Sequence, residues 1–133
     1  MRILVVDDEA IVLDSCRRVL EADGFEVLLA PSVEEALKTI DDLTQTGPLL
    51  LLIDVKMPVH DGMYLMKKVK EKCPQLPVIV MSGYPTAETI QTAEQLGAVT
   101  FIAKPFTPDE LLETLTSVLA EGETHEPKES IGN

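Results

Sequence analysis

The sequence predicts an α/β domain in which one parallel sheet of five strands carries helices on both faces. Its length of 133 residues suits a single domain, which at this size buries roughly two thirds of its unfolded surface without a disulfide or a structural metal. Apolar residues make up 45% of the chain, which excludes a disordered protein. Short apolar runs alternate with longer amphipathic stretches, which is the pattern of buried parallel strands connected by helices.

The five predicted strands are short runs of mainly aliphatic residues. The first begins almost at Met1, and the third is aliphatic from Leu49 to Ile53. Strands that are buried on both faces need no alternation of apolar and polar residues, so these continuous runs favour a sheet covered on both sides. The predicted strands comprise residues 2–6, 25–30, 49–53, 77–81 and 98–102.

The first two predicted helices follow from an apolar face and from a capping box. In the first helix, residues spaced by three and four positions predict an apolar face, and Gly24 ends the helix. The members of that face are Ile11, Val12, Ser15, Cys16, Val19 and Leu20. In the second helix, Ser32 and Glu35 form a capping box, and the helix runs toward Leu43.

The remaining three helices have different kinds of signal. Asp61 is expected to cap the third helix. Residues 86–96 predict a weaker helix, because this stretch has few large apolar side chains. A capping box of Thr107 and Glu110 opens the last helix, which is expected to end near Leu119.

Five strands that each precede a helix predict a (βα)5 chain, because right-handed crossovers place the helices on both faces of one open sheet. We expect a flavodoxin-like three-layer sandwich with the strand order 2-1-3-4-5, whose ligands bind at the carboxyl ends of the strands. The domain is expected to comprise residues 1–120. Residues 121–133 contain Ile131 as their only aliphatic residue, so we expect a flexible tail or a linker stub there.

The charge balance restricts the partners of this chain. Lys plus Arg number 11 and Asp plus Glu number 23, so the formal net charge is −12. A surface this acidic repels phosphate backbones and anionic lipids, which argues against direct binding of nucleic acid or of a membrane. The apolar runs are too short to cross a bilayer, and the first strand leaves no room for a signal peptide. Cys16 and Cys73 lack the spacing of a metal or redox motif, so we expect a cytoplasmic protein with reduced thiols.

Charged and hydroxyl side chains follow four of the predicted strands. They are Asp7, Asp8 and Glu9 after the first strand, Asp54 after the third, Ser82 after the fourth and Lys104 after the fifth. Because the carboxyl ends of parallel strands open onto one edge, these side chains are expected to converge in a shallow cleft. Two unit charges about 4 Å apart repel by roughly 1 kcal/mol in water and about 4 kcal/mol at an intermediate dielectric, so the aspartates need a cation among them. Oxygen ligands in a wet site suit Mg²⁺.

Asp54 is the predicted nucleophile of this cleft. It follows a run of aliphatic residues that holds it rigidly, and a carboxylate beside Mg²⁺ can attack phosphorus. Lys104 and the metal would neutralise charge on the transferring group, and Ser82 can donate a hydrogen bond to one of its oxygens. These residue types therefore point to the transfer of a phosphoryl group to an aspartate.

Four separated motifs resemble the receiver domain of bacterial two-component response regulators. They are Val5-Val6-Asp7-Asp8-Glu9, then Asp54-Val55-Lys56-Met57-Pro58 with Asp61-Gly62, then Met81-Ser82-Gly83, and finally Lys104-Pro105-Phe106. The resemblance covers about residues 1–120. The motifs stand in the family's order and spacing, which makes the resemblance specific.

The resemblance implies a role for each residue of the site. Asp54 would accept a phosphoryl group from a phosphohistidine on a sensor histidine kinase or on a histidine phosphotransfer protein. Asp8, Asp54 and the backbone carbonyl of Lys56 would bind Mg²⁺, and Asp7 would act on the metal through water. Lys104 would contact the phosphoryl group and would be followed by a cis peptide bond to proline.

The resemblance also implies a switch. Ser82 would sense the phosphoryl group, and Phe101 matches the aromatic switch position on the fifth strand. The family often has tyrosine there, so a phenylalanine must act through ring packing rather than through a hydroxyl. Lys56 and Tyr84 occupy positions that tune the lifetime of the phosphoryl group in this family. The face of residues 86–119 is expected to bind a partner or to form a homodimer after phosphorylation.

Two other functions share parts of this pattern. A Mg²⁺-dependent phosphatase with an aspartyl-phosphate intermediate, of the haloalkanoate dehalogenase class, would need Asp-x-Asp after its first strand, where this chain has adjacent aspartates at 7 and 8. A flavodoxin-like electron carrier would cradle the phosphate of FMN in a loop that is acidic here. We therefore expect a signalling switch that only phosphorylates and dephosphorylates itself. Whether it stands alone, shuttles phosphate in a phosphorelay or forms the N-terminal receiver of a longer regulator stays open.

Overall fold

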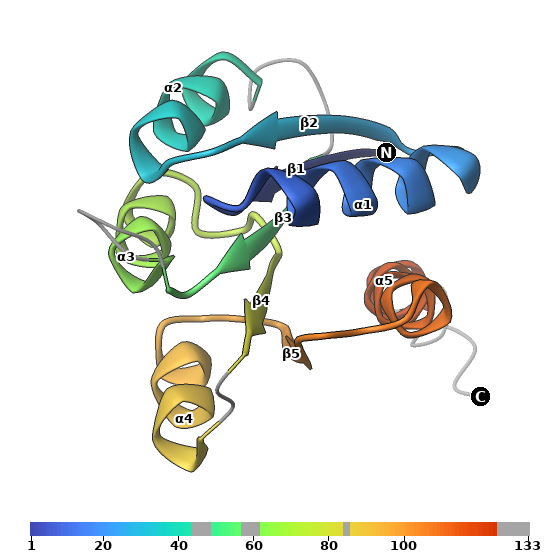
Figure 1. Ribbon diagram of the computed structural model, residues 1–133. Helices are drawn as coiled ribbons and strands as arrows, with labels where there is room; N and C mark the ends of the chain where they lie inside the picture. The colour runs from blue at the N-terminus through green and yellow to red at the C-terminus, as the bar shows by residue number, and fades with distance from the viewer. Residues whose placement is uncertain (44–48, 57–61, 84–85, 125–133) are drawn as a thin grey trace.

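The computed structural model describes residues 1–43, 49–56, 62–83 and 86–124. Five strands and five helices alternate along this part of the chain (Figure 1). The strands are β1 (Arg2–Val6), β2 (Glu26–Ala30), β3 (Leu49–Asp54), β4 (Val78–Ser82) and β5 (Thr100–Ala103). The helices are α1 (Ala10–Ala22), α2 (Val33–Leu43), α3 (Gly62–Lys72), α4 (Ala87–Gln95) and α5 (Pro108–Thr124). None of these helices is long and apolar enough to span a membrane.

All five strands are parallel and pair in the order β2-β1-β3-β4-β5, which confirms the predicted topology. The order reverses at β1, whose Val6 lies opposite both Ala30 of β2 and Ile53 of β3. Asp54, one position further along, lies opposite Met81 of β4. The strands therefore end almost level with one another, and the residues that follow them meet at one edge of the sheet.

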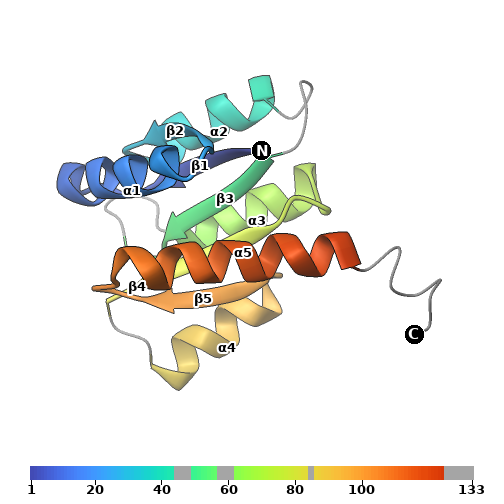
Figure 2. The same cartoon turned by 90° about the vertical axis from the view of Figure 1, so that its right-hand side faces the viewer.

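Helices cover both faces of the sheet, and each face has its own apolar core (Figures 1 and 2). Successive strand residues alternate between the two cores, so Ile3 and Val5 contribute to one while Leu4 and Val6 contribute to the other. Helices α1 and α5 pack on the first core through Leu13, Cys16, Leu20, Leu111 and Leu115. Helices α2, α3 and α4 pack on the second through residues that include Ala36, Ile40, Leu65, Val69 and Ala93.

Side chains cap three of the helices, and two of these caps, Ser32 and Thr107, were predicted from the sequence. The backbone N–H of Glu35 donates to Ser32 Oγ at 3.2 Å, and that of Thr89 donates to Thr86 Oγ1 at 3.1 Å. At α5 the capping box is complete, because Glu110 N–H donates to Thr107 Oγ1 at 3.1 Å and Thr107 N–H donates to Glu110 Oε1 at 2.8 Å. Asp61, the expected cap of α3, lies outside the described residues.

Two expectations for the helices were wrong in detail. The apolar face of α1 contains Leu13 rather than Ile11 and Ser15, because Leu13, Cys16 and Leu20 turn toward the sheet and leave Ile11 75% exposed. Helix α5 continues to Thr124, beyond the expected end near Leu119. An apolar pattern marks where a helix packs, and its backbone hydrogen bonds can continue past that point.

Candidate functional site

The candidate site lies at the edge of the sheet where the strands end. Asp7 directly follows β1, Asp54 ends β3, Ser82 ends β4 and Lys104 directly follows β5. The structure thus brings together the strand ends that the sequence predicted. The Lys104 N–H also donates to the carbonyl of Ser82 at 2.8 Å, which ties the end of β5 to the end of β4.

Three carboxylates form an acidic cluster at this edge. Asp7 is fully buried, Asp54 is 4% exposed and Asp8 faces solvent. An oxygen from each of the three lies within 4.8 Å of the others. Backbone donors orient the two buried groups: Glu9 N–H donates to Asp7 Oδ1 at 2.9 Å, and Lys56 N–H donates to Asp54 Oδ1 at 3.3 Å.

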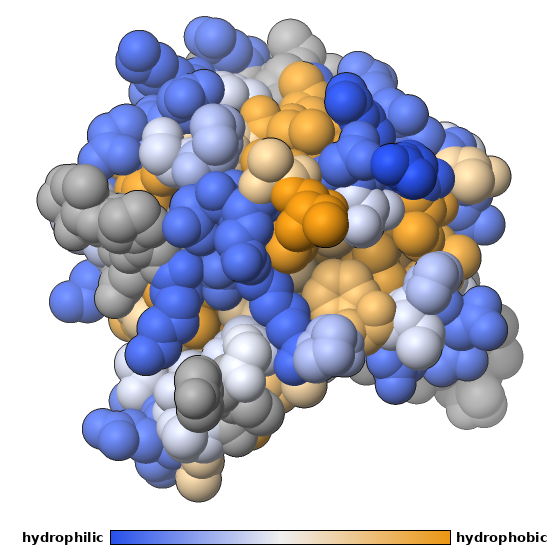
Figure 3. Space-filling model, viewed as in Figure 1, coloured by the Kyte–Doolittle hydropathy of each residue, from blue (hydrophilic) through white to orange (hydrophobic). Residues whose placement is uncertain are grey.

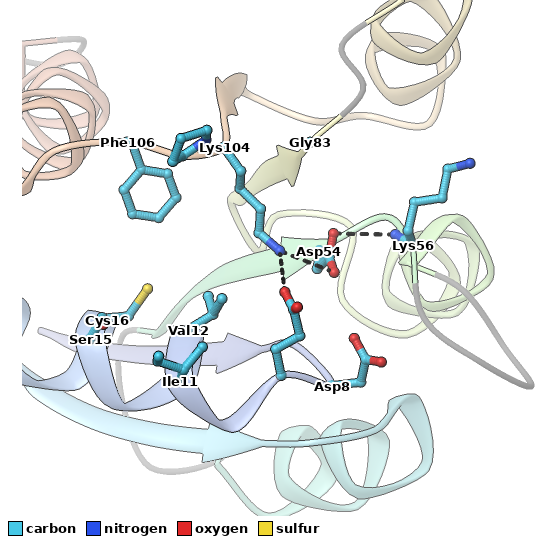
Figure 4. Close-up of a pocket in the computed structure, with 12 residues that line it drawn as sticks. Asp8, Ile11, Val12, Ser15, Cys16, Asp54, Lys56, Gly83, Lys104 and Phe106 are labelled. Carbon is cyan, nitrogen blue, oxygen red and sulfur yellow. Dashed lines mark hydrogen bonds and ion pairs between the residues drawn. The ribbon is translucent and has the colours of Figure 1, made fainter.

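Lys104 reaches toward Asp54 at the edge of the sheet (Figure 4). It also contacts Asp7, so it bridges the two buried carboxylates of the cluster. Its Nζ lies 2.8 Å from Asp7 Oδ2 and 3.3 Å from Asp54 Oδ2, with Glu9 Oε1 further away at 3.6 Å. The lysine side chain is only 15% exposed, so its charge is screened little by solvent. The peptide bond between Lys104 and Pro105 is cis, as the resemblance implied.

The positive charge of Lys104 does not fully offset the cost of burying Asp7 and Asp54 as charged carboxylates. Burial raises the pKa of Asp7, and the attraction of Lys104 offsets only part of that effect. Burial also raises the pKa of Asp54, and the negative charge of Asp7 raises it further, against the opposing effect of Lys104. Burial lowers the pKa of Lys104, but its interactions with Asp7 and Asp54 outweigh that and raise it above 10.5, so the lysine stays charged. Ionised carboxylates here are therefore not fully compensated by the protein.

This donor set fits a hard divalent cation. Three carboxylates converge, and oxygen ligands are those that Mg²⁺ and Ca²⁺ prefer. Asp7 Oδ2 is buried, and within the described ranges its single ion-pair partner is Lys104 Nζ at 2.8 Å, which leaves room for a further cation. The exposed Asp8 leaves one side of the cluster open to water, which suits an ion that keeps part of its hydration shell.

The site opens into a cleft of about 770 Å³ between α1 and the start of α5. One wall is polar and carries Asp8, Glu9, Asp54, Lys56 and Lys104. The other wall is largely apolar and carries Ile11, Val12, Cys16, Pro105 and Phe106. Figure 3 shows the two kinds of surface side by side, with hydrophobic residues gathered between α1 and α5 next to a hydrophilic area. The cleft can therefore receive a charged group together with an apolar neighbour.

Not every predicted residue lies in the cleft. Ser82 is fully buried beneath it, although its neighbour Gly83 lines it. Phe101 is half-buried in β5 and packs against the core under α2, α3 and α4. Lys56 is exposed at the rim. Tyr84 and the motif residues Met57, Pro58 and Asp61 lie outside the described residues.

Two features of the site escaped the sequence reasoning. The exposed Ile11 forms part of the cleft wall, but in the sequence it looks like any residue of an amphipathic helix. Gly62 begins α3 against the end of β3, where a Cβ would clash with the backbone oxygen of Asp54. The sequence marked this glycine as part of the Asp61-Gly62 motif after a predicted helix cap, but it did not indicate the close approach to Asp54.

Residues 3–116 match the protein family described as "Response regulator receiver domain". Among curated proteins, the chain is 32% identical over 118 residues to sporulation initiation phosphotransferase F of Bacillus subtilis, covering 89% of this chain and 93% of that protein. It is also 32% identical over 129 residues to the transcriptional regulatory protein FixJ of Bradyrhizobium diazoefficiens. That match covers 97% of this chain and 62% of FixJ, so FixJ extends well beyond the region of similarity.

Two solved structures agree with these sequence matches. A CheY-like response regulator receiver domain protein from Methanospirillum hungatei superposes with a TM-score of 0.84 at 34% identity, covering 93% of this chain and 97% of that one. A receiver domain protein from Clostridium thermocellum gives a TM-score of 0.83 at 30% identity, with coverages of 92% and 96%. Fold and sequence therefore lead to the same family.

Proposed function

The chain belongs to the response regulator receiver domain family, and on that premise we propose that it is a signalling switch whose phosphoacceptor is Asp54. One observation carries the proposal: the Asp54 carboxylate opens into a cleft while Lys104 and two further aspartates surround it. We assign the receiver to residues 1–120. The sporulation phosphotransferase similar to this chain supports an exchange of phosphoryl groups with a protein.

Phosphorylation at this site is a direct displacement. An oxygen of Asp54 attacks the phosphorus of a phosphohistidine, the P–N bond breaks as the new P–O bond forms, and the released imidazole takes a proton from water. The N–H of Lys56 already orients one oxygen of Asp54. Lys104 is held near enough to follow the transferred group, because its Nζ lies 3.3 Å from Asp54 Oδ2. Its positive charge stabilises the transferring phosphoryl oxygens.

Mg²⁺ is the metal we propose for the acidic cluster. Asp8, Asp54 and the carbonyl of Lys56 would hold it, with Asp7 acting through water. When bound, the ion would offset carboxylate charge and stabilise negative charge on the phosphoryl group. Asp7 is buried beside Asp54 and holds Lys104 in the site, so its own contribution is to position that lysine.

The proposed donor is a sensor histidine kinase or a histidine phosphotransfer protein. The apolar wall of the cleft supports this, because Ile11 is 75% exposed and stands with Pro105 and Phe106 beside the acceptor. Exposed apolar groups next to a reacting carboxylate suit contact with a protein more than with a small polar donor. We propose a cytoplasmic location, where such kinases present their phosphohistidine.

The switch would turn over no substrate other than its own phosphoryl group. Ser82 and Lys104 would move toward the new dianion. Ser82 precedes α4 in the chain, Lys104 directly follows β5, and a hydrogen bond joins the two residues. The face of residues 86–119 would then change and bind a partner protein or a second copy. The acid-lined first loop does not favour FMN, because it would repel the cofactor's phosphate.

Phosphorylation with acetyl phosphate and Mg²⁺ tests the assignment. We expect one hydroxylamine-labile phosphoryl group on the parent chain and none on Asp54→Asn. Asp42→Asn, which changes an exposed aspartate on α2, is the matched control and should be labelled like the parent. Equal labelling of Asp54→Asn and the parent would overturn the assignment of the acceptor.

A further inference from the structure

Of the described residues that line the cleft, Glu9 is the one carboxylate to which the proposed chemistry gives no role. It is the N-cap residue of α1, but its side chain accepts no capping hydrogen bond from the described residues. Its backbone is fixed on both sides, because its N–H donates to Asp7 Oδ1 at 2.9 Å and its carbonyl accepts from the N–H of Leu13 at 3.1 Å. The side chain instead lies in the cleft, with Oε1 3.6 Å from Lys104 Nζ.

The negative charge of Glu9 is not compensated within the site. The three clustered aspartates carry three negative charges, and Lys104 together with a divalent cation would carry three positive ones. Lys56 is the other cation among the described residues that line the cleft, but its ammonium group points away from Asp54 (Figure 4). Burial is the main cause of the raised pKa of Asp7, and the charge of Glu9 adds to it, so the field of Glu9 reaches into the cluster.

A phosphoryl donor has to approach the site past this charge. The side chain of Glu9 is 60% exposed and that of Lys104 is 15% exposed, so the carboxylate lies nearer to solvent than the lysine that would stabilise the transferring group. A small acyl phosphate such as acetyl phosphate is a dianion at neutral pH, and it has few atoms with which to offset the repulsion. A phosphohistidine arrives on a protein, whose contacts with the apolar wall of the cleft can offset it.

We propose that Glu9 is a specificity-determining residue of the phosphoryl-transfer site, whose carboxylate disfavours small anionic phosphodonors relative to a phosphohistidine carried by a protein. The repulsion acts before any bond forms, while the phosphoryl oxygens of the donor approach Lys104. With acetyl phosphate, an oxygen of Asp54 then attacks phosphorus, the P–O bond to the acetyl group breaks, and acetate leaves. The inference rests on the proposed function, because it needs Asp54 as the acceptor.

The rate of phosphorylation by acetyl phosphate at saturating Mg²⁺ measures this repulsion. Glu9→Gln keeps the shape of the side chain and removes its charge, so we expect the second-order rate constant to rise about threefold or more, and Glu9→Lys should raise it further. Glu21→Gln is the matched control, because it removes the same charge from the exposed far end of α1. That end is about 18 Å away along the helix axis, beyond the Debye length of about 10 Å at 0.1 M salt. Equal rate constants for Glu9→Gln and the parent would overturn the proposal.

The charge of the donor and the ionic strength distinguish selection by charge from a general effect on Lys104. Phosphoramidate is protonated on nitrogen near neutral pH and so has less net negative charge than acetyl phosphate; its P–N bond breaks and ammonia leaves. Glu9→Gln should therefore accelerate phosphoramidate less than acetyl phosphate, and both gains should shrink as NaCl screens the charges. An equal gain for the two donors, or a gain that persists at high salt, would mean that the substitution merely frees Lys104 and would contradict the proposal.

Binding of beryllofluoride gives a second readout, which does not depend on turnover. We expect amide shifts of the ¹⁵N-labelled Glu9→Gln chain with Mg²⁺ to reach their midpoint at a lower beryllofluoride concentration than those of the parent. A negative charge near a helix N-terminus also stabilises the helix, so thermal melts are recorded for each variant. A lower melting temperature of Glu9→Gln with unchanged rate constants and unchanged binding would show that Glu9 is only structural.

Labelling of Asp54→Asn distinguishes failure of this inference from failure of the proposed function. If Asp54 is not the acceptor, Asp54→Asn is phosphorylated like the parent, and the proposed function fails whatever the effect of Glu9. If Asp54 is the acceptor and Glu9 selects nothing, Asp54→Asn loses the label while Glu9→Gln is labelled at the rate of the parent.

Discussion

At the scale of single residues, Asp54 combines burial with its proposed role as phosphoacceptor. It is 4% exposed, and burial and the charge of Asp7 raise its pKa above the ordinary value of 3.8. Between pH 3.8 and the raised pKa of the folded state, the folded chain therefore binds more protons at Asp54 than the unfolded chain does. The free energy of unfolding falls through this interval, and the full cost of the buried charge is present above it.

Asp54→Asn removes this cost while keeping the shape of the side chain. We expect a higher melting temperature for the variant than for the parent near neutral pH in EDTA, and a smaller difference below about pH 4. A gain of about 1 kcal/mol would shift the midpoint by about 3–5 °C, which calorimetry resolves easily. A lower melting temperature for Asp54→Asn near neutral pH would mean that its attraction to Lys104 outweighs its burial.

The two cysteines should differ sharply in reactivity. Cys16 is 1% exposed, and burial together with the negative charge of Asp7 raises its pKa to about 11. Near pH 8 only about one Cys16 thiol in a thousand is then ionised, and the thiolate is the nucleophile. Cys73 is partly exposed. Iodoacetamide followed by peptide mass analysis should find Cys73 modified in the folded chain and Cys16 modified only after unfolding.

Gly62 should be essential for the position of the backbone at Asp54. A Cβ there would lie 2.3 Å from the carbonyl oxygen of Asp54 and 2.8 Å from the Cα of Val55, and neither backbone atom can move freely. Gly62→Ala should therefore destabilise the fold by about 1–3 kcal/mol, as overpacking does, and should also weaken Mg²⁺ binding.

Gly83 offers the matched control for that substitution. It lines the same cleft, but a Cβ at this position meets nothing within 4 Å. Gly83→Ala should leave the melting temperature nearly unchanged. Similar losses of stability from both substitutions, measured by urea unfolding, would argue against a specific clash at Gly62.

At the scale of elements, β4, β5 and α4 form the mobile part of the proposed switch. Helix α4 has Ala93 as its only fully buried side chain, so little apolar contact anchors it. The hydrogen bond from Lys104 N–H to the Ser82 carbonyl couples the two strands, and Phe101 lies opposite Val80 in their register. Movement of Ser82 or Lys104 should therefore be transmitted to α4 and β5.

Amide chemical shifts with and without beryllofluoride and Mg²⁺ test this coupling. We expect large changes in residues 82–106 as well as around Asp54. Asp54→Asn cannot hold the phosphoryl mimic and should show neither set. Changes confined to the loops at Asp8 and Asp54 would mean that the site binds its ligand without switching.

An element could be predicted well when its sequence allows a single way of burying its apolar residues, and less well when it allows several. The strand at Leu49–Asp54 was nearly unambiguous, because its consecutive aliphatic residues have only one buried environment that suits them. Helix α1 was ambiguous, because Ile11, Val12 and Leu13 are consecutive and permit two phasings of the apolar face. Contact with the sheet selected Leu13, which the sequence alone cannot reveal.

The acidic site was predictable in its location and not in its energetics. Parallel topology sufficed to bring Asp7, Asp54 and Lys104 to one edge. Which of the adjacent Asp7 and Asp8 is buried depends on how the chain turns after β1, and no residue pattern encodes that turn. The apolar wall of the cleft likewise arises only when α1 and α5 come together.

At the scale of the whole molecule, the net charge of −12 should make stability depend on salt. Acidic residues repel one another across the surface, and salt screens that repulsion over a Debye length of about 10 Å at 0.1 M. NaCl should therefore raise the melting temperature of the parent chain. Variants that keep most of the negative charge should show the same rise in melting temperature with NaCl. An effect of bound metal must therefore be measured as an increase beyond this rise.

Mg²⁺ should stabilise the chain beyond this screening, because the folded acidic cluster is the proposed binding site and the unfolded chain has no such cluster. At a free Mg²⁺ concentration tenfold above its dissociation constant, mass action adds about 1.4 kcal/mol to the free energy of unfolding. Melts in MgCl₂ and in NaCl at equal ionic strength isolate this increment. Asp8→Asn, at the exposed ligand, should remove the increment and keep the response to NaCl, whereas Asp42→Asn should keep both. Equal melting temperatures of the parent in the two salts would show that the cluster is merely screened.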